Sequence, residues 1–433
     1  MKISLIAVPT LALLLSACTI DTTDTSSPSG YGSGGGEGID SPDEKQVQAG
    51  CVRERDIQAS ETWSPTVCPD GYLVKSWIGV RGTGVEVKIE PGTIVKHEQG
   101  AGITVYGGAS LIAKGTTEKP IAFQGWQAVP GTWQGLVFVS NSAKNELSHV
   151  TVSDAGSNKD IDGAIHVGQS YEQQGSVKLS DVVVKNNALY GLYLHRDGKL
   201  GAMANVRFEN NAKGVAHVEA PAVAQLRGIG SGNNYIGNGD NIVVIETNIL
   251  VEVTEDAVWP DMSPAKYRVV GQGNEGGDVV RVKQKLTIEP GAQFEMAGGS
   301  GFLVLGGSAG LKAVGAPDKK IVFEGVNGSA WTGITYGEST WSENRLENVE
   351  IKNASKAPEW QYYGVNDTDY KVASILMGYN GATPVQLTLK NVTVSGPNNA
   401  PADVFKKNAC NLVLEGTNVG AAGGALAVET TPF

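Results

Sequence analysis

Three aspartates in one short segment are the first candidates for chemistry in this sequence. Asp154, Asp160 and Asp162 lie within DAGSNKDID, residues 154 to 162. Carboxylate oxygens are ligands that Ca²⁺ prefers, so these three side chains could hold a calcium ion. Their spacing is not that of an EF-hand loop, and a solvated surface loop is the alternative interpretation. The sequence indicates no other cofactor.

Aromatic residues gather in a second segment, KAPEWQYYGVNDTDY, residues 356 to 370. Trp360, Tyr362, Tyr363 and Tyr370 lie there in a polar context. Exposed rings can stack on sugar faces or anchor a protein partner. We therefore predict a ligand-binding loop here, for a polysaccharide or another envelope protein. Rings folded back onto the body of the protein are the alternative.

The first residues of the chain form a leader. Lys2 supplies a positive charge, and residues 3 to 15 are apolar but too few to span a bilayer. The Leu-Ser-Ala-Cys that follows, ending at Cys18, resembles the lipobox of bacterial surface lipoproteins. The resemblance implies that residues 1–17 are a signal peptide and that Cys18 carries lipid such as palmitate. An ordinary secretory signal cleaved near Ala17 is the alternative.

The segment after this cysteine has the composition of a tether. Residues 19 to 50 are mainly Ser, Thr, Gly, Asp and Pro, which bury little and stay flexible. We predict that residues 18–50 comprise the lipidated Cys18 and this tether. In the lipoprotein resemblance, Thr19 rather than Asp implies the outer membrane. The expected location is the cell envelope, surface-exposed or facing the periplasm, with the membrane as a partner through the lipid.

Two further cysteines stand at the start of the predicted folded part. In an exported protein, Cys51 and Cys68 are expected to form a disulfide. Closing a loop of that size stabilises a fold by roughly 3 kcal/mol in the chain-entropy model. Cys410 is left over, and we predict a small buried apolar side chain there, with a reactive thiol as the alternative.

Short segments with apolar residues two apart recur along the chain. They begin at residues 147, 179, 203, 226, 346 and 389, and two of the steps are 24 and 23 residues. A period of two predicts a β-strand with those side chains on one face. One such strand cannot bury its face alone, whereas a stack of copies can.

The residue two places after each strand pair is Asp or Asn in five of the six segments. Asn tolerates the left-handed backbone region and bonds locally, so it ends a strand in a tight turn. Asparagines in successive coils can also stack into an amide ladder. The sequence predicts this ladder at Asn186, Asn210, Asn233 and Asn353, with Asp154 at the same position of another segment.

These features resemble the right-handed parallel β-helix of the pectate-lyase type. That fold has stacked aliphatic residues inside and an asparagine ladder at one turn. The resemblance covers nearly everything after residue 75 and implies an all-β solenoid with coils about 4.8 Å apart. A pair of β-sandwiches is the alternative, but it does not explain the 23-residue period.

The chain also contains a long internal repeat. Residues 88 to 125 and 287 to 325 match at a Pro-Gly turn, at paired glycines and at a Phe-x-Gly end, with an offset of 199 or 200. A repeat of this kind predicts the architecture. We expect two tandem units of about 200 residues, at 51–250 and 251–433.

Members of the resembled fold include polysaccharide lyases and glycoside hydrolases. Those enzymes use paired carboxylates, or Arg/Lys with calcium-binding acids. This chain has no clustered Asp pairs beside a Gly-His-Gly or Arg-x-Lys segment, and no Trp-Ile-Asp-His segment. Its histidines are dispersed, at His97, His149, His166, His195 and His217. We therefore predict no catalytic residues.

The net charge of −11 argues against a nucleic-acid partner, which requires Lys/Arg clusters. We expect a lipid-anchored envelope β-helix with a binding, adhesion or structural role toward polysaccharide or an envelope protein. A divergent polysaccharide lyase or glycoside hydrolase is the alternative.

Overall fold

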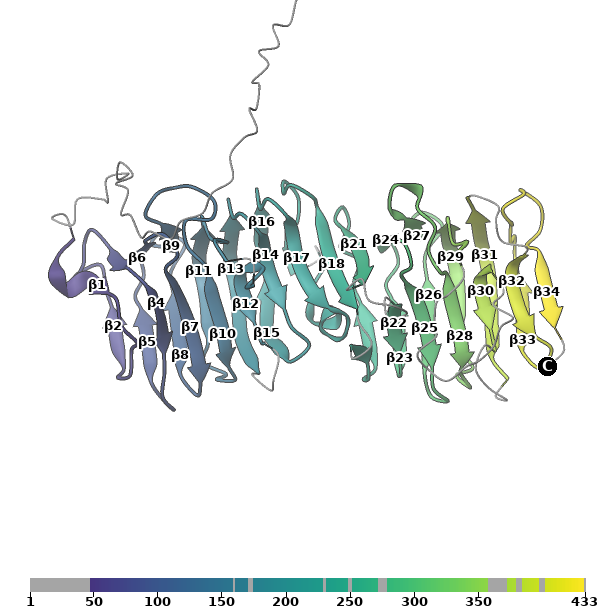
Figure 1. The fold of residues 1–433 in the computed structure, drawn as a ribbon, viewed down its shortest axis with the longest axis horizontal. Coiled ribbons are helices and arrows are strands. Elements are labelled where there is room, and N and C mark those ends of the chain that lie inside the picture. The colour runs from purple at the N-terminus through teal and green to yellow at the C-terminus, as the bar shows by residue number, and fades with distance from the viewer. Residues whose placement is uncertain are drawn as a thin grey trace, which may run out of the picture. The chain divides into compact units, whose positions relative to one another are not determined.

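The computed structural model describes residues 47–158, 160–169, 174–228, 231–247, 251–271, 279–356, 372–378, 384–396 and 402–431. Almost all of the regular structure there is β-strand (Figure 1). The strands form three sheets, and the named strands pair in parallel. The parallel β-helix is thereby confirmed. In these ranges no helix has the length and apolar character needed to cross a membrane.

Three stacks of strands build the N-terminal half, residues 47–247. The first contains β2 (Glu61–Trp63), β5 (Glu86–Ile89), β8 (Ser110–Lys114) and β15 (Gly198–Ala204). The second contains β1 (Val52–Arg53), β3 (Tyr72–Val74), β6 (Ile94–His97), β9 (Ile121–Gly125) and β16 (Arg207–Glu209). The long strands β11 (Glu146–Ser153) and β13 (Gly175–Lys185) belong to both stacks. The third contains β4 (Trp77–Val80), β7 (Gly102–Gly107), β10 (Leu136–Ser140), β12 (Gly163–Val167), β14 (Tyr190–Leu194), β17 (Gly214–Glu219) and β18 (Ile242–Thr247).

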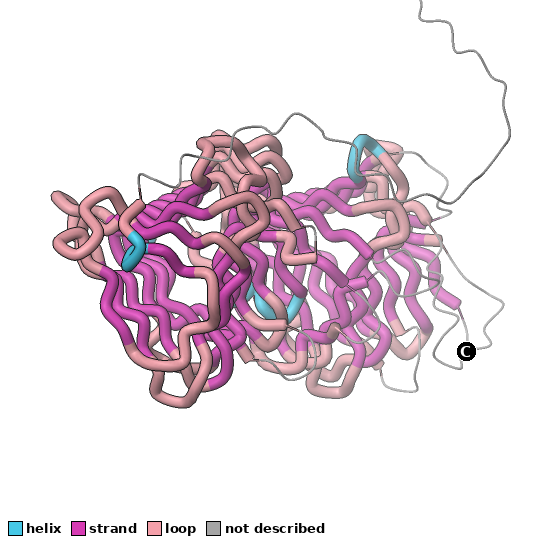
Figure 2. The backbone as a smooth tube through the Cα atoms, turned by 60° about the vertical axis from the view of Figure 1, so that its left-hand side comes forward, coloured by secondary structure: helices cyan, strands magenta, loops and turns pink. Residues whose placement is uncertain are grey.

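The C-terminal half repeats this arrangement. Its first stack contains β20 (Ala257–Trp259), β23 (Lys285–Ile288), β26 (Gly310–Val314) and β33 (Asn411–Glu415), and its second contains β21 (Lys266–Gly271), β24 (Gln293–Met296) and β27 (Ile321–Gly325). The strands β29 (Arg345–Lys352) and β31 (Gln386–Ser395) again belong to both. Its third contains β19 (Glu252–Val253), β22 (Val279–Val282), β25 (Gly301–Leu305), β28 (Ile334–Glu338), β30 (Ala373–Met377), β32 (Ala402–Lys407) and β34 (Val428–Thr431). Short helical turns are η2 (Ala49–Cys51), η3 (Ala220–Gln225) and η5 (Val326–Gly328) (Figure 2).

The core is made of rows of apolar side chains that run from coil to coil. One row in the second stack joins five buried residues in register: Val95, Phe123, Val152, Val184 and Phe208. Fully burying a side chain of this kind contributes about 1.5–3 kcal/mol. The period-two pattern in the sequence therefore supplies the interior of the coils.

The turns after these strands are built as the sequence indicates, but the buried ladder lies one residue later. Asn186 and Asn210 have positive φ, 55° and 53°, and touch each other at the surface at 3.4 Å. After this left-handed residue the next side chain points inward. Asn187 Nδ2 donates to Asn211 Oδ1 at 2.7 Å, and Asn211 Nδ2 donates to Asn238 Oδ1 at 2.8 Å.

The other predicted ladder residues have different places. Asp154 and Asn353 also have positive φ, 66° and 63°, and so take part in the same kind of turn. Asn233 is buried instead, and its Oδ1 accepts a hydrogen bond from Val206 N at 2.8 Å. The amide of Asn233 therefore secures a neighbouring coil without joining a ladder with Asn210.

The two halves make the same contacts at matching positions. Trp133 Nε1 donates to Ser153 O at 2.6 Å, and Trp331 Nε1 donates to Lys352 O at 2.7 Å. The amide oxygens of Asn145 and Asn344 accept from the backbone of the strand one coil earlier, at 2.9 and 3.0 Å. Residues 47–433 nevertheless form one compact unit. The division into 51–250 and 251–433 stays a prediction about repetition inside that unit.

The stacks change partners where the halves meet. The third stack of the N-terminal half ends with β18, which pairs with β21 of the second stack of the C-terminal half over six residues. These strands belong to one 16-stranded sheet. Matching strands of the two halves therefore occupy different faces of the β-helix.

The beginning of the folded unit is held by the predicted disulfide. Cys51 and Cys68 are bonded, which confirms this pairing. Cys410 is free and buried, with 5% of its surface exposed. Cys18 and the tether up to residue 46 lie outside the described residues.

Candidate functional site

The outward side chains of one stack differ in kind from those of its neighbours. On the first and second stacks of the N-terminal half, outward strand positions hold mostly charged and small polar side chains, among them Glu86, Lys88, Lys96, Gln124, Lys178 and Lys185. On the third stack they hold rings and aliphatic groups. We call this surface the aromatic face and define it by Trp77, Tyr106, Val137, Val139, His166, Tyr190, Tyr193 and His217.

Strand register explains why these residues face outward together. Val137, His166, Tyr193 and His217 are paired in sequence along β10, β12, β14 and β17. Their neighbours in each strand, such as Leu192, are fully buried in the core. Since side chains alternate across a strand, the paired row must lie on the outer surface.

The rings of this row contact one another across the coils. His166 stacks on Tyr193 with centroids 4.5 Å apart, and His217 meets the edge of Tyr193 at 5.2 Å. Tyr190 lies tilted against His217 at 5.4 Å. Tyr190 and Tyr193 are each partly exposed, so a ligand can reach them.

His217 is held between two carboxylates. Its Nδ1 donates to Asp162 Oδ2 at 2.5 Å, and its Nε2 lies 2.8 Å from Glu246 Oε2 as an ion pair. Burial disfavours the charged imidazole, but the two carboxylates outweigh burial and raise the pKa of His217 to about 9. His217 is therefore a cation at neutral pH.

Asp162 is shared with a second cation. Lys213 Nζ lies 2.7 Å from Asp162 Oδ1 and 5.3 Å from the ring centroid of Tyr190. Burial alone would raise the pKa of Asp162, but His217 and Lys213 lower it below its usual range.

A second polar group lies at the carboxyl end of the same strands. Arg196 Nη1 lies 3.2 Å from Glu219 Oε2, and Glu219 also lies 3.5 Å from Nε2 of the buried His195. Asp197 N donates to His195 Nδ1 at 3.2 Å, so the proton of the neutral ring is on Nε2, toward Glu219. Burial lowers the pKa of His195 in spite of Glu219.

Glu219 and Glu246 connect the two groups, because they are paired in register on β17 and β18. Each carboxylate has a cationic partner, Arg196 for Glu219 and His217 for Glu246. Carboxylates paired with cations can also accept hydrogen bonds from polar groups. The arrangement is therefore suited to binding a polar ligand.

The three predicted calcium ligands are not brought together. Asp154 is buried and accepts from Ser153 Oγ at 2.8 Å, Asp162 binds His217 and Lys213, and Asp160 is exposed. In the described ranges, no three His, Cys, Asp or Glu side chains are placed to hold a metal ion. The amino group of Lys213 and the imidazole of His217 already supply positive charge beside Asp162, as calcium would.

The predicted aromatic loop is a different case. Trp360, Tyr362, Tyr363 and Tyr370 lie outside the described residues, so the ligand-binding loop stays a prediction.

Two of the five histidines, His166 and His217, lie on the aromatic face, and the buried His195 lies at the carboxyl end of the same strands, although all three are dispersed in the sequence. The other two are elsewhere: His97 is buried and stacks on Trp133 at 3.8 Å, and His149 lies within β11 near Asp181. Tyr193 and His217 are 24 residues apart, the same step as Asn186 and Asn210. Comparing residues of every type at positions 24 apart, and not only asparagines, would have identified Tyr193 and His217 as neighbours.

A groove of about 1400 Å³ lies where the two halves meet. Its lining comes from residues 224, 226–228 and 231 and from segments within 258–263, 289–293 and 316–322. Both charge signs are present, for example Arg227 and Lys319 with Asp261 and Glu289. The lining that the structure describes includes no aromatic ring, in contrast to the aromatic face.

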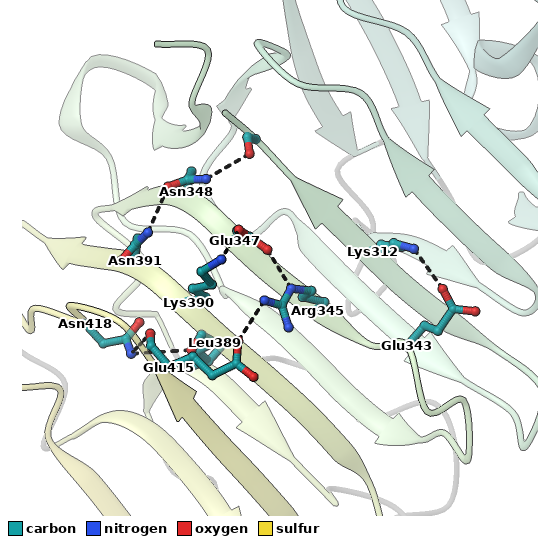
Figure 3. Close-up of polar contacts among 11 residues, drawn as sticks. Lys312, Glu343, Arg345, Glu347, Asn348, Leu389, Lys390, Asn391, Glu415 and Asn418 are labelled. Atoms are coloured by element: carbon teal, nitrogen blue, oxygen red, sulfur yellow. Dashed lines mark hydrogen bonds and ion pairs between the residues drawn. The ribbon is translucent and has the colours of Figure 1, made fainter. Parts of the chain in front are cut away.

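The outer surface of the C-terminal half is different again. Arg345 bonds Glu347 at 2.7 Å and Glu415 at 2.9 Å, and Lys390 bonds Glu347 at 2.8 Å (Figure 3). Asn391 Nδ2 donates to Asn348 Oδ1 at 3.2 Å beside them. These paired charges run from coil to coil and resemble a solvated surface more than a binding site.

Comparison with protein-family models, curated proteins and solved structures found no match to this chain.

Proposed function

We propose that this protein is a lipid-anchored envelope β-helix that binds a polysaccharide through the aromatic face. The observation that carries the proposal is the gathering of Trp77, Tyr106, Tyr190 and Tyr193, all partly exposed, on one stack. Rings with polar ends offer apolar contact area together with hydrogen-bonding groups. Binding sites combine these two properties, whereas the outward positions of the neighbouring stacks are mostly charged or small and polar.

The anchor in this proposal is Cys18. Its support is the lipobox resemblance in the sequence. Metabolic labelling with palmitate should mark the wild-type chain and fail to mark Cys18→Ala. Labelling that persists in the variant would remove the anchor from the proposal.

The binding experiment uses the full chain on a glycan array. We expect retention of at least one polysaccharide, weakened at least tenfold in the double variant Trp77→Ala, Tyr193→Ala. Trp126→Ala is the matched control, because Trp126 is also partly exposed but lies beside Lys96, away from the aromatic face. Binding that survives the double change in a folded variant would refute the site. Capture of an envelope protein with no glycan retained would refute the ligand class.

A hydrolase is the second candidate, and the pairing of Glu219 with Glu246 on adjacent coils is the observation that favours it. Two carboxyl groups flanking a glycosidic bond can act as acid and nucleophile. The retained polysaccharide should stay intact on prolonged incubation if the protein only binds. Release of new reducing ends, abolished in Glu246→Gln, would establish the hydrolase instead.

A further inference from the structure

A short segment crosses the middle of the aromatic face. The side chain of Ile161 packs against Val137 and Val139 on the outer side of β10, with Trp77 and Tyr106 beside them. Only 5% of the surface of each valine is exposed. Outward aliphatic groups on a β-helix surface are buried here because Ile161 lies over them.

Residues 160–162 are fastened to the sheet by polar contacts to three side chains. His166 Nδ1 donates to Ile161 O at 2.5 Å, since a carbonyl can only accept. Asp162 is bound by His217 at 2.5 Å and by Lys213 at 2.7 Å. Two of these three contacts therefore end on one carboxylate, that of Asp162.

The segment belongs to no strand of the β-helix. Residues 160–162 precede β12, which begins at Gly163, and have no ladder partner. Displacing them breaks side-chain contacts but leaves the coils paired. Asp160, beside Ile161, is exposed.

We infer that residues 160–162 form a strap that regulates access to the aromatic face. The contacts of Asp162 with His217 and Lys213 hold this strap in place. In the closed state Ile161 occupies the apolar surface between the rings of Tyr106 and His166. When Asp162 leaves His217 and Lys213, Val137 and Val139 become available to the ligand. Because the strap would regulate the proposed binding site, this inference rests on the proposed function.

Two variants of the full chain weaken or remove the contacts of Asp162 in different ways. Asp162→Asn keeps the size of the side chain and removes its charge. Asp162→Gly removes both contacts of the Asp162 side chain, and glycine tolerates the positive φ of 49° at this position. Asp160→Asn is the matched control, since it removes a neighbouring charge from an exposed position.

Hydrogen exchange followed by mass spectrometry tests the strap without any ligand. We expect exchange at residues 160–162 to be at least tenfold faster in Asp162→Gly, faster to a smaller degree in Asp162→Asn, and unchanged in Asp160→Asn. Equal exchange in the wild type and both Asp162 variants would overturn the strap.

Affinity for the polysaccharide retained by the wild type tests the regulation. The Asp162 variants should bind severalfold more tightly than the wild type and the control. Faster exchange with unchanged affinity would overturn the regulation while the binding site stands. Faster exchange in a protein that retains no polysaccharide would instead refute the proposed function and leave the strap as a structural feature.

Discussion

Two histidines at neighbouring strands of the third stack differ in charge because of what surrounds them. His217 carries its proton at neutral pH because Asp162 and Glu246 approach both of its ring nitrogens. His195, 22 residues earlier, stays neutral because burial prevails and Nδ1 accepts a backbone N–H. One residue type thus serves as a fixed cation in one place and as a neutral donor in the other.

The charge of His217 gives the protein a stability that depends on pH. Its pKa is about 9 in the folded chain and 6.5 without partners, so the folded state favours the cation. The stabilisation, on the order of 3 kcal/mol, is fully present below pH 6.5 and is lost as the pH rises through about 9. Asp162 has a pKa below its usual range in the folded chain. Its contribution to stability is therefore lost in acid, as the pH falls through this lowered pKa of Asp162.

We predict that His217→Gln lowers the free energy of unfolding most below pH 6.5 and least above pH 9. Urea unfolding of wild type and variant at several pH values measures the difference. His149→Asn is the control, because His149 is a surface histidine with positive φ that asparagine tolerates. A difference for His217→Gln that does not change with pH would show that His217 is not a cation in the folded protein.

At the scale of elements, the asparagine ladder holds successive turns together. Asn211 is fully buried, accepts from Asn187 and donates to Asn238 and to Val184 O. The surface residue Asn210 provides the left-handed turn, and the buried residue after it provides the hydrogen bonds. Buried amides without partners are costly, so each coil depends on the next.

We predict that Asn211→Ala lowers the free energy of unfolding by about 2–4 kcal/mol, because Asn187 Nδ2 loses its acceptor while Val184 O and Asn238 Oδ1 each lose a donor. Chemical denaturation measures the loss. Asn210→Gly should be close to neutral, since glycine also adopts positive φ and Asn210 is exposed. If Asn210→Gly proved the more damaging change, the ladder would belong to the surface position.

The sequence predicted the strands and turns well for a physical reason. Apolar residues two apart and a left-handed Asn after them are local features, and the β-helix repeats them at each coil. The one-residue displacement of the ladder could not be read from the period, because Asn186 and Asn187 are adjacent and both asparagines. Only the backbone shows which of the two side chains points inward.

The aromatic face was harder to predict than the core. Trp77, Tyr106 and Tyr193 follow no single motif, and they meet only because consecutive coils are in register. The contact between Asp162 and His217 joins residues 55 apart across an inserted segment. Neither hydropathy nor spacing specifies where such an insertion lies on a sheet.

At the scale of the folded unit, strands of both halves belong to one sheet, but matching strands of the two halves lie on different faces of the β-helix. Because β18 pairs with β21, the sheet that carries the aromatic face continues into the second stack of the C-terminal half. Its outward residues there include Arg268 and Glu295, which lie 2.7 Å apart. The internal repeat predicted equivalent strands. It could not predict which stack of the second half would follow which stack of the first, since that depends on the junction around η3.

The disulfide stabilises the first coils of this unit. Replacing Cys51 and Cys68 by serine together should lower the free energy of unfolding by about 3 kcal/mol, because the unfolded chain then loses a closed loop spanning 17 residues. Guanidinium unfolding of the oxidised wild type and the double variant measures this. The buried Cys410, changed to alanine, is the control for loss of a thiol elsewhere. Equal unfolding midpoints for the wild type and the double variant would show that the disulfide does not stabilise the first coils.

Hydroxyl-radical footprinting of the full chain with its retained polysaccharide tests the central claim most directly. The account predicts that Trp77, Tyr106, Tyr190 and Tyr193 become protected from oxidation when the ligand binds, while Trp126 does not. Protection confined to the junction groove, at Val258 and Pro290, or absent from all four rings, would contradict it.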